Sequence, residues 1–362
     1  MESPKRSIVD HRWGWFGWSD ERAREFTELA REGSFPGRIL RQQHGKFQLV
    51  CPEGEMEAGV RGRLRREGTY PVVGDWVAVS PNTGGGGVIE QVLSRSSLIL
   101  RKVPGRRSRE QAIAANIDTI FIMMSLNRDY DLRRLERYLI LAWDSGAHPV
   151  IVLSKADLCP DPAHQIAQVE EVALGIPVTA LSSLTGQGLS SLDSYLEKRK
   201  TVAFLGSSGV GKSTLINRLL GEDVIPTQEI RPGDDRGRHT TTHRELFLLP
   251  SGGVLLDTPG LREIQFVDAE GGFDATFGDI EELAGQCRYR DCRHQVEPDC
   301  AVQEAVTDGR LDRYRYRNYL KIRKELELQT RRLDLSASLQ EKKKRKEMNK
   351  TLRKIVQEKR QR

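Results

Sequence analysis

The middle of the chain contains long, nearly unbroken apolar runs, which are typical of strands buried on both faces of a sheet. Between these runs lie segments with helical spacing, at 133–146, 188–199 and 213–221. The expected strands are IDTIFIMMSL (117–126), PVIVL (149–153), IPVTALSS (176–183), TVAFLG (201–206), HRELFLLP (243–250) and GGVLLD (252–257). Six strands with intervening helices predict a doubly wound α/β sheet.

The pattern before residue 105 is different, because short β-type runs alternate with Gly- and Pro-containing turns. Five or so such strands in about seventy residues predict a small barrel of the OB kind. Arg61, Arg63, Arg65 and Arg66 would line one hairpin of this barrel. Such barrels often bind RNA, but on these arginines alone a solvated basic face is the better interpretation.

The two ends of the chain have compositions of their own. HRWGWFGW (11–18) precedes a helical stretch at 21–33, and we expect this aromatic cluster to pack against the next domain rather than to serve as a docking element. Residues 341–362 carry eleven Lys or Arg against three Glu, a net charge of +8, whereas the whole chain has +6. The basicity is therefore concentrated in a tail, which we expect to be helical and to contact rRNA phosphates.

Bulk composition favours a soluble cytoplasmic protein of two or three domains. The chain has 362 residues, 38% apolar and 30% charged, and no run of the roughly 18 apolar residues that span a bilayer. The N-terminus lacks the apolar run of a secretory signal. Three of the five cysteines lie between 287 and 300, which suits a metal site better than a disulfide framework.

A complete phosphate-loop motif, G-x-x-x-x-G-K-[ST], follows the strand at 201–206. Its glycines would let backbone N–H groups surround phosphate oxygens, Lys212 would reach the β and γ phosphates, and Ser213 would bind Mg²⁺. A strand before it and an amphipathic helix after it fit the motif. The predicted phosphate-binding residues are Gly206, Ser207, Ser208, Gly209, Val210, Gly211, Lys212, Ser213 and Thr214.

The base-reading residues are expected at the ends of two earlier strands. Ser154, Lys155, Ala156 and Asp157 resemble the N-K-x-D element of GTPases, in which the aspartate accepts hydrogen bonds from guanine. Serine stands where that element has Asn, so a bond to the base or to the phosphate loop could be lost. Ser182 and Ser183, after the next strand, would form the last base-contacting loop.

The remaining catalytic residues follow the phosphate loop. Asp257 would hold Mg²⁺ through water and the N–H of Gly260 would meet the γ phosphate. A switch threonine is expected at Thr240 or Thr241, between which the sequence does not decide. Leu261 occupies the place where Ras-like GTPases carry the water-positioning glutamine, so His239 is the candidate for that role, with a solvated loop residue as the equal alternative.

Cys287, Cys292, His294 and Cys300 offer three thiolates and one imidazole within fourteen residues. This set closes a tetrahedral site and leaves no position for catalysis, so we predict one structural zinc ion. The region has too few apolar residues for a large core, and loss of the metal should unfold it locally.

The motifs occur in the order SKAD, SSL, GSSGVGKS, GRHTTT, DTPG, which is the usual GTPase cycle cut before its fourth strand and rejoined through GLSSLDSYLEKRK (188–200). With the barrel before and the Cys/His cluster after, the chain closely resembles the circularly permuted GTPases of the RsgA/YjeQ family, most specifically in GRHTTTHREL, DTPGLRE and CRYRDCRHQVEPDCAV. The resemblance implies an α/β fold: a circularly permuted P-loop GTPase domain between an OB-like barrel and a zinc-binding α-helical domain. The predicted boundaries are 1–34 (extension), 35–105 (barrel), 106–267 (GTPase), 268–320 (zinc domain) and 321–362 (basic tail).

The resemblance further implies a monomeric GTPase that binds GTP, GDP and the small ribosomal subunit with its rRNA, without a membrane. It would act late in maturation of that subunit, be stimulated by it, and associate or leave according to its nucleotide. Two alternatives remain: an rRNA-binding module gated by nucleotide with negligible hydrolysis, suggested by Leu261 and Ser154, and a P-loop kinase or ATPase, which Asp157 opposes.

Overall fold

The structure is a computed structural model that describes residues 13–43, 45–66, 69–82, 84–103, 109–127, 129–225, 244–257, 270–328 and 330–331. The chain divides into two compact units. The first comprises residues 1–101, 111–265 and 271–276, and the second comprises residues 102–110, 266–270 and 277–362.

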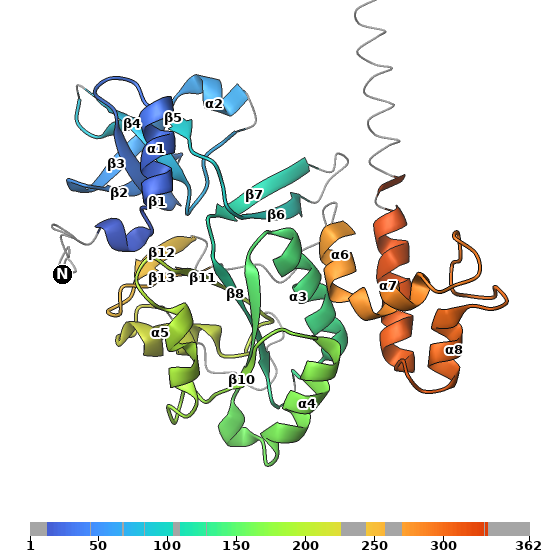
Figure 1. Ribbon diagram of the computed structural model, residues 1–362. Coiled ribbons are helices and arrows are strands. Elements are labelled where there is room, and N and C mark those ends of the chain that lie inside the picture. Colours follow the sequence, from blue (N-terminus) through green and yellow to red (C-terminus); the bar gives the residue numbers. More distant parts are fainter. Residues whose placement is uncertain are drawn as a thin grey trace, which may run out of the picture. The chain divides into compact units, whose positions relative to one another are not determined.

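A closed barrel forms the N-terminal part of the first unit (Figure 1). Its strands follow the order β1-β2-β3-β5-β4, and β4 returns to pair with β1. Phe47, Leu49, Val77 and Ile89 fill its interior with no exposed surface. The strands are β1 (Phe35–Gln43), β2 (Lys46–Cys51), β3 (Gly54–Val60), β4 (Trp76–Pro81) and β5 (Gly87–Val92). The predicted barrel is thus confirmed.

Two local expectations in this region are wrong. The backbone of the arginine-rich segment forms a short helix, α2 (Gly62–Arg66), instead of one side of a hairpin, because Arg and Leu favour helix when they come in a row. The segment at 97–102 lies inside the predicted barrel range (35–105) but is not a barrel strand. It forms β6 (Leu98–Val103), which pairs with β7 (Arg109–Ala115) in a separate two-stranded sheet.

The α/β sheet follows the barrel in the chain, with strand order β10-β9-β8-β11-β13-β12. All neighbours in this part are parallel except β12, which runs antiparallel to β13. The strands are β8 (Thr119–Ser125), β9 (His148–Ser154), β10 (Val178–Ala180), β11 (Thr201–Leu205), β12 (Glu245–Leu248) and β13 (Val254–Asp257). The connecting helices are α3 (Leu132–Asp144), α4 (Pro162–Val172) and α5 (Lys212–Leu220), with 3-10 turns η2 (Ala156–Leu158) and η3 (Leu189–Tyr195).

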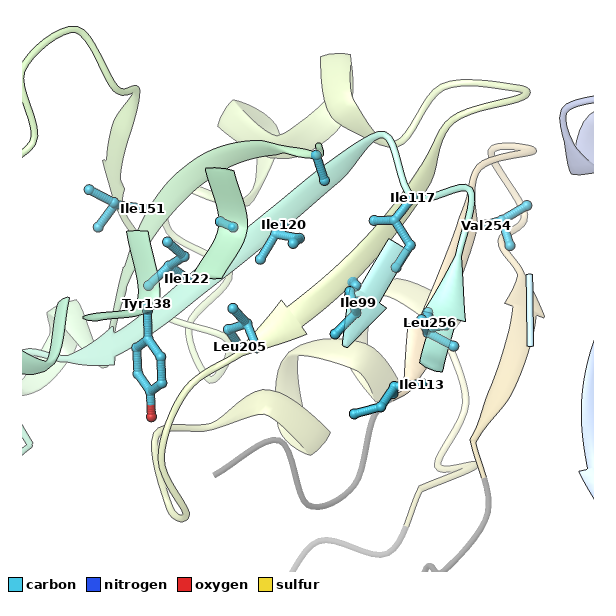
Figure 2. Packing of buried hydrophobic residues seen from close by; sticks show 14 of the residues in the cluster. Ile99, Ile113, Ile117, Ile120, Ile122, Tyr138, Ile151, Leu205, Val254 and Leu256 are labelled. Atoms are coloured by element: carbon cyan, nitrogen blue, oxygen red, sulfur yellow. The ribbon is translucent and has the colours of Figure 1, made fainter. Parts of the chain in front are cut away.

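Both faces of this sheet are buried, as the apolar runs predict. Along β8, Ile120 and Ile122 join one apolar cluster, while Phe121 and Met123 join another on the opposite face. Figure 2 shows Ile120 and Ile122 beside Ile151 and Leu205 of the first cluster. Burying such side chains contributes about 1.5–3 kcal/mol each, which stabilises the sheet along whose edge the loops meet.

The N-terminal segment packs onto the first unit, as expected. Its 3-10 turn η1 (Trp13–Phe16) buries Phe16, and helix α1 (Asp20–Leu29) follows. The ring of Trp76 on β4 lies 5.9 Å from that of Trp13 and 5.0 Å from that of Trp18, measured between centroids. The aromatic cluster is therefore a structural element of this unit.

A buried arginine joins the N-terminal segment, the barrel and the α/β sheet. Arg38 on β1 is 1% exposed and donates hydrogen bonds to the carbonyls of Phe16, Gly74 (3.2 Å) and Asn116 (2.9 Å). Burial lowers the pKa of Arg38 to about 9, and the three carbonyls compensate the lost hydration. Gly74 has a φ of +90°, and a Cβ there would lie 2.1 Å from the Ala115 carbonyl oxygen. This junction therefore fixes the barrel against β8.

The second unit is helical. Helices α7 (Gly278–Ala284) and α8 (Ala301–Thr307) and a helix over 313–328 surround a small core of Ile280, Val302 and Ile322. The rings of Phe277 and Tyr319 lie 5.4 Å apart. Helix α6 (Glu270–Thr276) belongs almost entirely to the first unit. No helix among the described residues is long and apolar enough to cross a bilayer.

Candidate nucleotide and zinc sites

The phosphate loop turns between β11 and α5, where the motif predicts it. Gly206, Gly209 and Gly211 all have positive φ, at 151°, 78° and 99°. A Cβ on Gly206 would lie 2.6 Å from the carbonyl oxygen of Met123, so only glycine fits against β8. The Lys212 ammonium donates to the carbonyl oxygens of Gly206 (2.6 Å) and Ser207 (2.5 Å). The lysine thus lies across the loop, where a triphosphate would meet it.

The SKAD loop contacts the phosphate loop directly. The Ser154 hydroxyl donates to the carbonyl oxygen of Val210 at 2.5 Å, and the Lys155 ammonium donates to that of Gly209 at 2.6 Å. Lys155 has a left-handed backbone, φ 60°, which ends β9 and starts η2. Asp157 follows two residues later in η2, with its side chain exposed. The structure therefore brings the predicted base-reading segment beside the predicted phosphate cradle.

The loop that contains Ser182 and Ser183 is hydrogen-bonded to the SKAD loop. The backbone N–H of Ala156 donates to the carbonyl of Leu181 at 3.1 Å. Ser182 is fully buried, and its hydroxyl accepts a bond from the N–H of Thr185 at 3.2 Å. Ser183 is half-buried. The Ser182 side chain is buried and orders the loop, so it does not face a base. The part of this loop that can contact a base is its backbone.

Asp257 ends β13 beside the phosphate loop. Burial raises the pKa of its carboxyl to about 6, the nearby Lys212 opposes this rise, and Glu245 adds to it. Ser213, the second residue of α5, is half-buried, and Thr214 is exposed. A serine hydroxyl and a carboxylate are hard oxygen donors of the kind that Mg²⁺ prefers, so this pair fits the predicted metal. Bound cation would stabilise the charged carboxylate, which burial alone disfavours.

The other predicted catalytic residues are His239, Thr240, Thr241 and Gly260. They lie outside the described residues, as does Leu261. Their roles stay predictions.

Sequence reasoning missed two residues at this edge of the sheet. The Asp129 carboxylate accepts a hydrogen bond from the Ser207 hydroxyl in the phosphate loop. The guanidinium of Arg134 donates to that carboxylate at 2.7 Å and to the Asp129 carbonyl at 2.6 Å. A signal was present, because Asp129 follows the carboxyl end of β8, which is adjacent to the phosphate-loop strand.

In the second unit, the four predicted zinc ligands come together. The ligand atoms of Cys287, Cys292, His294 and Cys300 all lie within 4.8 Å of one another. His294 Nδ1 is 3.5 Å from the sulfurs of Cys287 and Cys300, and these sulfurs are 3.8 Å apart. Tetrahedral zinc, with bonds of about 2.3 Å to sulfur and about 2.0 Å to nitrogen, requires separations of about 3.5 and 3.8 Å. The residues therefore fit a zinc ion, and burial raises the pKa of Cys300 to about 11 without one.

Neighbouring groups hold the zinc-ligand loop in place. The Glu297 carboxylate accepts hydrogen bonds from the backbone N–H groups of Gln295 (2.9 Å), Val296 (3.0 Å) and Arg293 (3.1 Å), which lower the pKa of Glu297 to about 2. The His294 carbonyl accepts from the Tyr316 hydroxyl and from Gln303, in α8, at 3.0 Å. Sequence reasoning did not single out Glu297, although an acid inside the ligand loop is a signal for such a role.

Comparisons with known proteins agree with this geometry. A profile of the RsgA GTPase family matches residues 92–267, and one of the RsgA N-terminal domain matches residues 36–89. The small ribosomal subunit biogenesis GTPase RsgA 2 of Lactiplantibacillus plantarum is 48% identical over 308 residues, which cover 84% of this chain and 87% of that protein. This chain belongs to the RsgA family. The RsgA of Methanosarcina acetivorans is 44% identical, over 92% of this chain and 90% of its own length.

Solved structures support the same RsgA assignment. The crystal structure of YjeQ from Thermotoga maritima superposes with a TM-score of 0.62 at 29% identity, covering 81% of this chain and 98% of that one. YloQ, described as a circularly permuted GTPase, gives 0.59 at 26% identity, covering 82% and 96%. The predicted fold class, an OB-like barrel, a permuted GTPase domain and a helical Cys3His part, is confirmed. The residue boundaries between these parts stay predictions.

Proposed function

We propose that this chain hydrolyses GTP and, as the names of its relatives state for those proteins, acts in biogenesis of the small ribosomal subunit. We place its action late in maturation, with GTP favouring association with the subunit and hydrolysis favouring release. The observation that carries the proposal is the pair of bonds from Ser154 and Lys155 to the phosphate loop, since it sets a guanine-reading element beside a triphosphate cradle.

Different residues of the site would bind the base, the phosphates and the Mg²⁺ ion of GTP. The Asp157 carboxylate accepts hydrogen bonds from the guanine ring N–H and amine, which adenine does not offer together. Lys212 and the N–H groups of the phosphate loop hold the β and γ phosphates. Ser213 and, through water, Asp257 hold Mg²⁺, which neutralises charge on the phosphates when it is bound. Thr240 or Thr241 would add a further oxygen to that metal, and the Gly260 N–H would contact the γ phosphate.

The attacking water needs a positioning group, since leucine at 261 can neither donate nor accept a hydrogen bond. We assign this role to His239. Changing His239 to Ala should lower the rate of GTP hydrolysis by about 10²-fold while nucleotide affinity stays the same. Single-turnover phosphate release and labelled-nucleotide titration measure the two effects separately, and an unchanged rate would remove His239 from the mechanism.

The remaining parts would serve contact with the subunit. We propose that the barrel and the basic tail bind rRNA, and that one zinc ion holds the second unit in shape without taking part in the chemistry. The protein would work as a monomer in the cytoplasm, where small subunits assemble. Its proposed domains are those given by the predicted boundaries.

One assay tests the proposal against its alternatives. Phosphate release from GTP and from ATP is measured with and without purified small subunits, with Lys212→Ala as the inactive control. Turnover of GTP, raised by small subunits, is the expected result. GTP binding without turnover would favour the nucleotide-gated RNA-binding module, and a preference for ATP would overturn the assignment of Asp157.

A further inference from the structure

Three charged side chains form a row that leads from the barrel to the nucleotide site. Arg41 on β1 is the direct cross-strand partner of Glu245 on β12, and Glu245 is the direct partner of Asp257 on β13. Directly opposed residues of antiparallel strands project from the same face of a sheet. Arg41, Glu245 and Asp257 therefore lie side by side across three adjacent strands.

An ion pair joins two members of this row, and electrostatic interaction links the others. The Arg41 guanidinium lies 3.3 Å from a Glu245 carboxylate oxygen, and Glu245 and Lys212 both act electrostatically on Asp257. Two basic side chains, Arg41 of the barrel and Lys212 of the phosphate loop, thus flank two acidic ones, Glu245 and Asp257. Glu245 also begins the strand that follows residues 226–243, which contain the predicted switch threonines.

The Arg41–Glu245 ion pair contributes little to the stability of the fold. Its side chains are 38% and 33% exposed, and ion pairs of this exposure contribute about 0–1 kcal/mol. Arg41 partly neutralises the negative charge of Glu245, which lies beside Asp257. Because Arg41 belongs to the barrel, a ligand bound to the barrel that contacts Arg41 would change this neutralisation.

We propose that the Arg41–Glu245 pair couples the barrel to the nucleotide site, so that a ligand of the barrel that draws Arg41 away changes the charge around Asp257 and hence the affinity for GTP and Mg²⁺. The inference rests on the proposed function, in which the barrel's ligand is rRNA. By linkage, GTP must then lower the affinity for that ligand by the same factor, so this pair limits the association with the subunit that GTP favours.

The expected size follows from the geometry. Strands lie about 4.8 Å apart, so Arg41 and Asp257 are about 10 Å apart across two spacings. At that distance, near one Debye length in about 0.1 M salt, one unit charge should change nucleotide affinity by about threefold. Loss of a positive charge should weaken GTP binding without metal and lower the Mg²⁺ concentration required for it. Loss of Glu245's charge should do the opposite.

The test titrates labelled GTP into the full chain, in EDTA and over a Mg²⁺ series. In EDTA, Arg41→Gln should weaken binding about threefold, Glu245→Gln should strengthen it about threefold, and the double variant should return to the wild-type value. Lys46→Gln is the matched control, because it removes the same charge from the barrel but Lys46 pairs with Glu57 on β3. It should bind GTP as the wild type does.

Small subunits provide the second readout. The ratio of subunit affinity with a non-hydrolysable GTP analogue to that with GDP should rise about threefold in Arg41→Gln, because the variant no longer makes GTP and the barrel's ligand oppose each other, and should stay unchanged in Lys46→Gln. Equal effects of Arg41→Gln and Lys46→Gln, or a double variant that does not revert, would overturn the coupling while leaving the proposed function intact. A wild-type chain that does not bind GTP would overturn both.

Discussion

Ser154 differs from the asparagine of the N-K-x-D element but still forms a hydrogen bond to the phosphate loop. Where related elements carry Asn, its hydroxyl donates to the phosphate-loop carbonyl of Val210. A hydroxyl has one donor, whereas an amide has two donors and an acceptor. The sequence left open which bond serine would lose, and the structure shows that the bond to the phosphate loop is kept. Ser154 is 2% exposed, so this bond is made away from water.

Removing the Ser154 hydroxyl should therefore loosen the cradle. In Ser154→Ala the buried Val210 carbonyl loses a donor, at a cost of about 1–2 kcal/mol, and GDP and GTP affinity should fall by about tenfold. Ser190→Ala, which changes an exposed serine of η3, is the control. Titration with a fluorescent nucleotide gives both values, and equal affinities for the two variants would show that the bond does not support nucleotide binding.

Asp257 gives a prediction for pH. Its folded-state pKa, about 6, lies above the ordinary value of about 3.9. The protonated acid therefore contributes stability that is present below about pH 4 and is lost as the pH rises through about 6. Asp257→Asn removes the buried charge, so the free energy of unfolding should rise by about 1–3 kcal/mol at pH 7.5 and by less at pH 5.

Urea unfolding of the nucleotide-free protein in EDTA measures this difference. Asp193→Asn, which changes an exposed acid on η3, is the control and should show the same small effect at both pH values. If Asp257→Asn were no more stable than the wild type at pH 7.5, its carboxylate would not be disfavoured by burial.

At the scale of the element, the apolar pattern predicted most strands of the sheet. It did not predict structure in segments where polar residues and turns determine the backbone conformation. Long buried runs such as β8 and β9 have few alternatives. The stretch at 188–199 was expected as an α-helix but forms the 3-10 turn η3, because Gly188 and a pair of serines favour tight turns over a helix interior. The antiparallel direction of β12 is not encoded in its four residues, since direction follows from the short turn that leads into β13.

The zinc cluster is an element whose fold depends on its metal. Cys292→Ser should lower bound zinc from one equivalent and unfold the ligand loop, because the second unit has a small apolar core. Small-subunit association should fall, and nucleotide affinity should stay within about twofold, since the phosphate loop belongs to the other unit. Zinc analysis and nucleotide titration measure the two outcomes.

Cys159→Ser is the matched control for this variant. Cys159 is a half-buried free cysteine in the first unit, so its change should leave the zinc content unaltered. Stoichiometric zinc in Cys292→Ser would show that the ligand set is wrong.

At the scale of the whole molecule, motif order predicted the architecture better than the contacts within it. The phosphate loop, the SKAD loop and the Cys/His cluster were recognisable because each chemistry needs certain residues at certain spacings. The contacts by which Arg38 joins the N-terminal segment, the barrel and the α/β sheet were not recognisable in this way. Nothing in the sequence around Arg38 distinguishes a buried arginine from a solvated one. Its partners are backbone carbonyls of Phe16, Gly74 and Asn116, which any residue could supply.

The basic tail gives the whole-molecule prediction. With a net charge of +8 over residues 341–362, the full chain should lose small-subunit affinity more steeply with salt than a chain ending at residue 340. The slope of log K against log salt should be steeper by several units, because each phosphate contact contributes about 0.9. Sedimentation with small subunits at 50–300 mM salt, about the range in which such contacts weaken, measures the slopes. Equal slopes would place the tail outside the interface.

Among the described residues, one eleven-stranded sheet runs through both the barrel and the GTPase part, and they join where β1 meets β12. Removing the barrel would leave β12 as an edge strand, because it takes away the strand that pairs with β12 at Glu245. An isolated GTPase fragment would thus be prone to self-association. Dissection of this protein for biophysical work is better done by point substitutions than by removing the barrel.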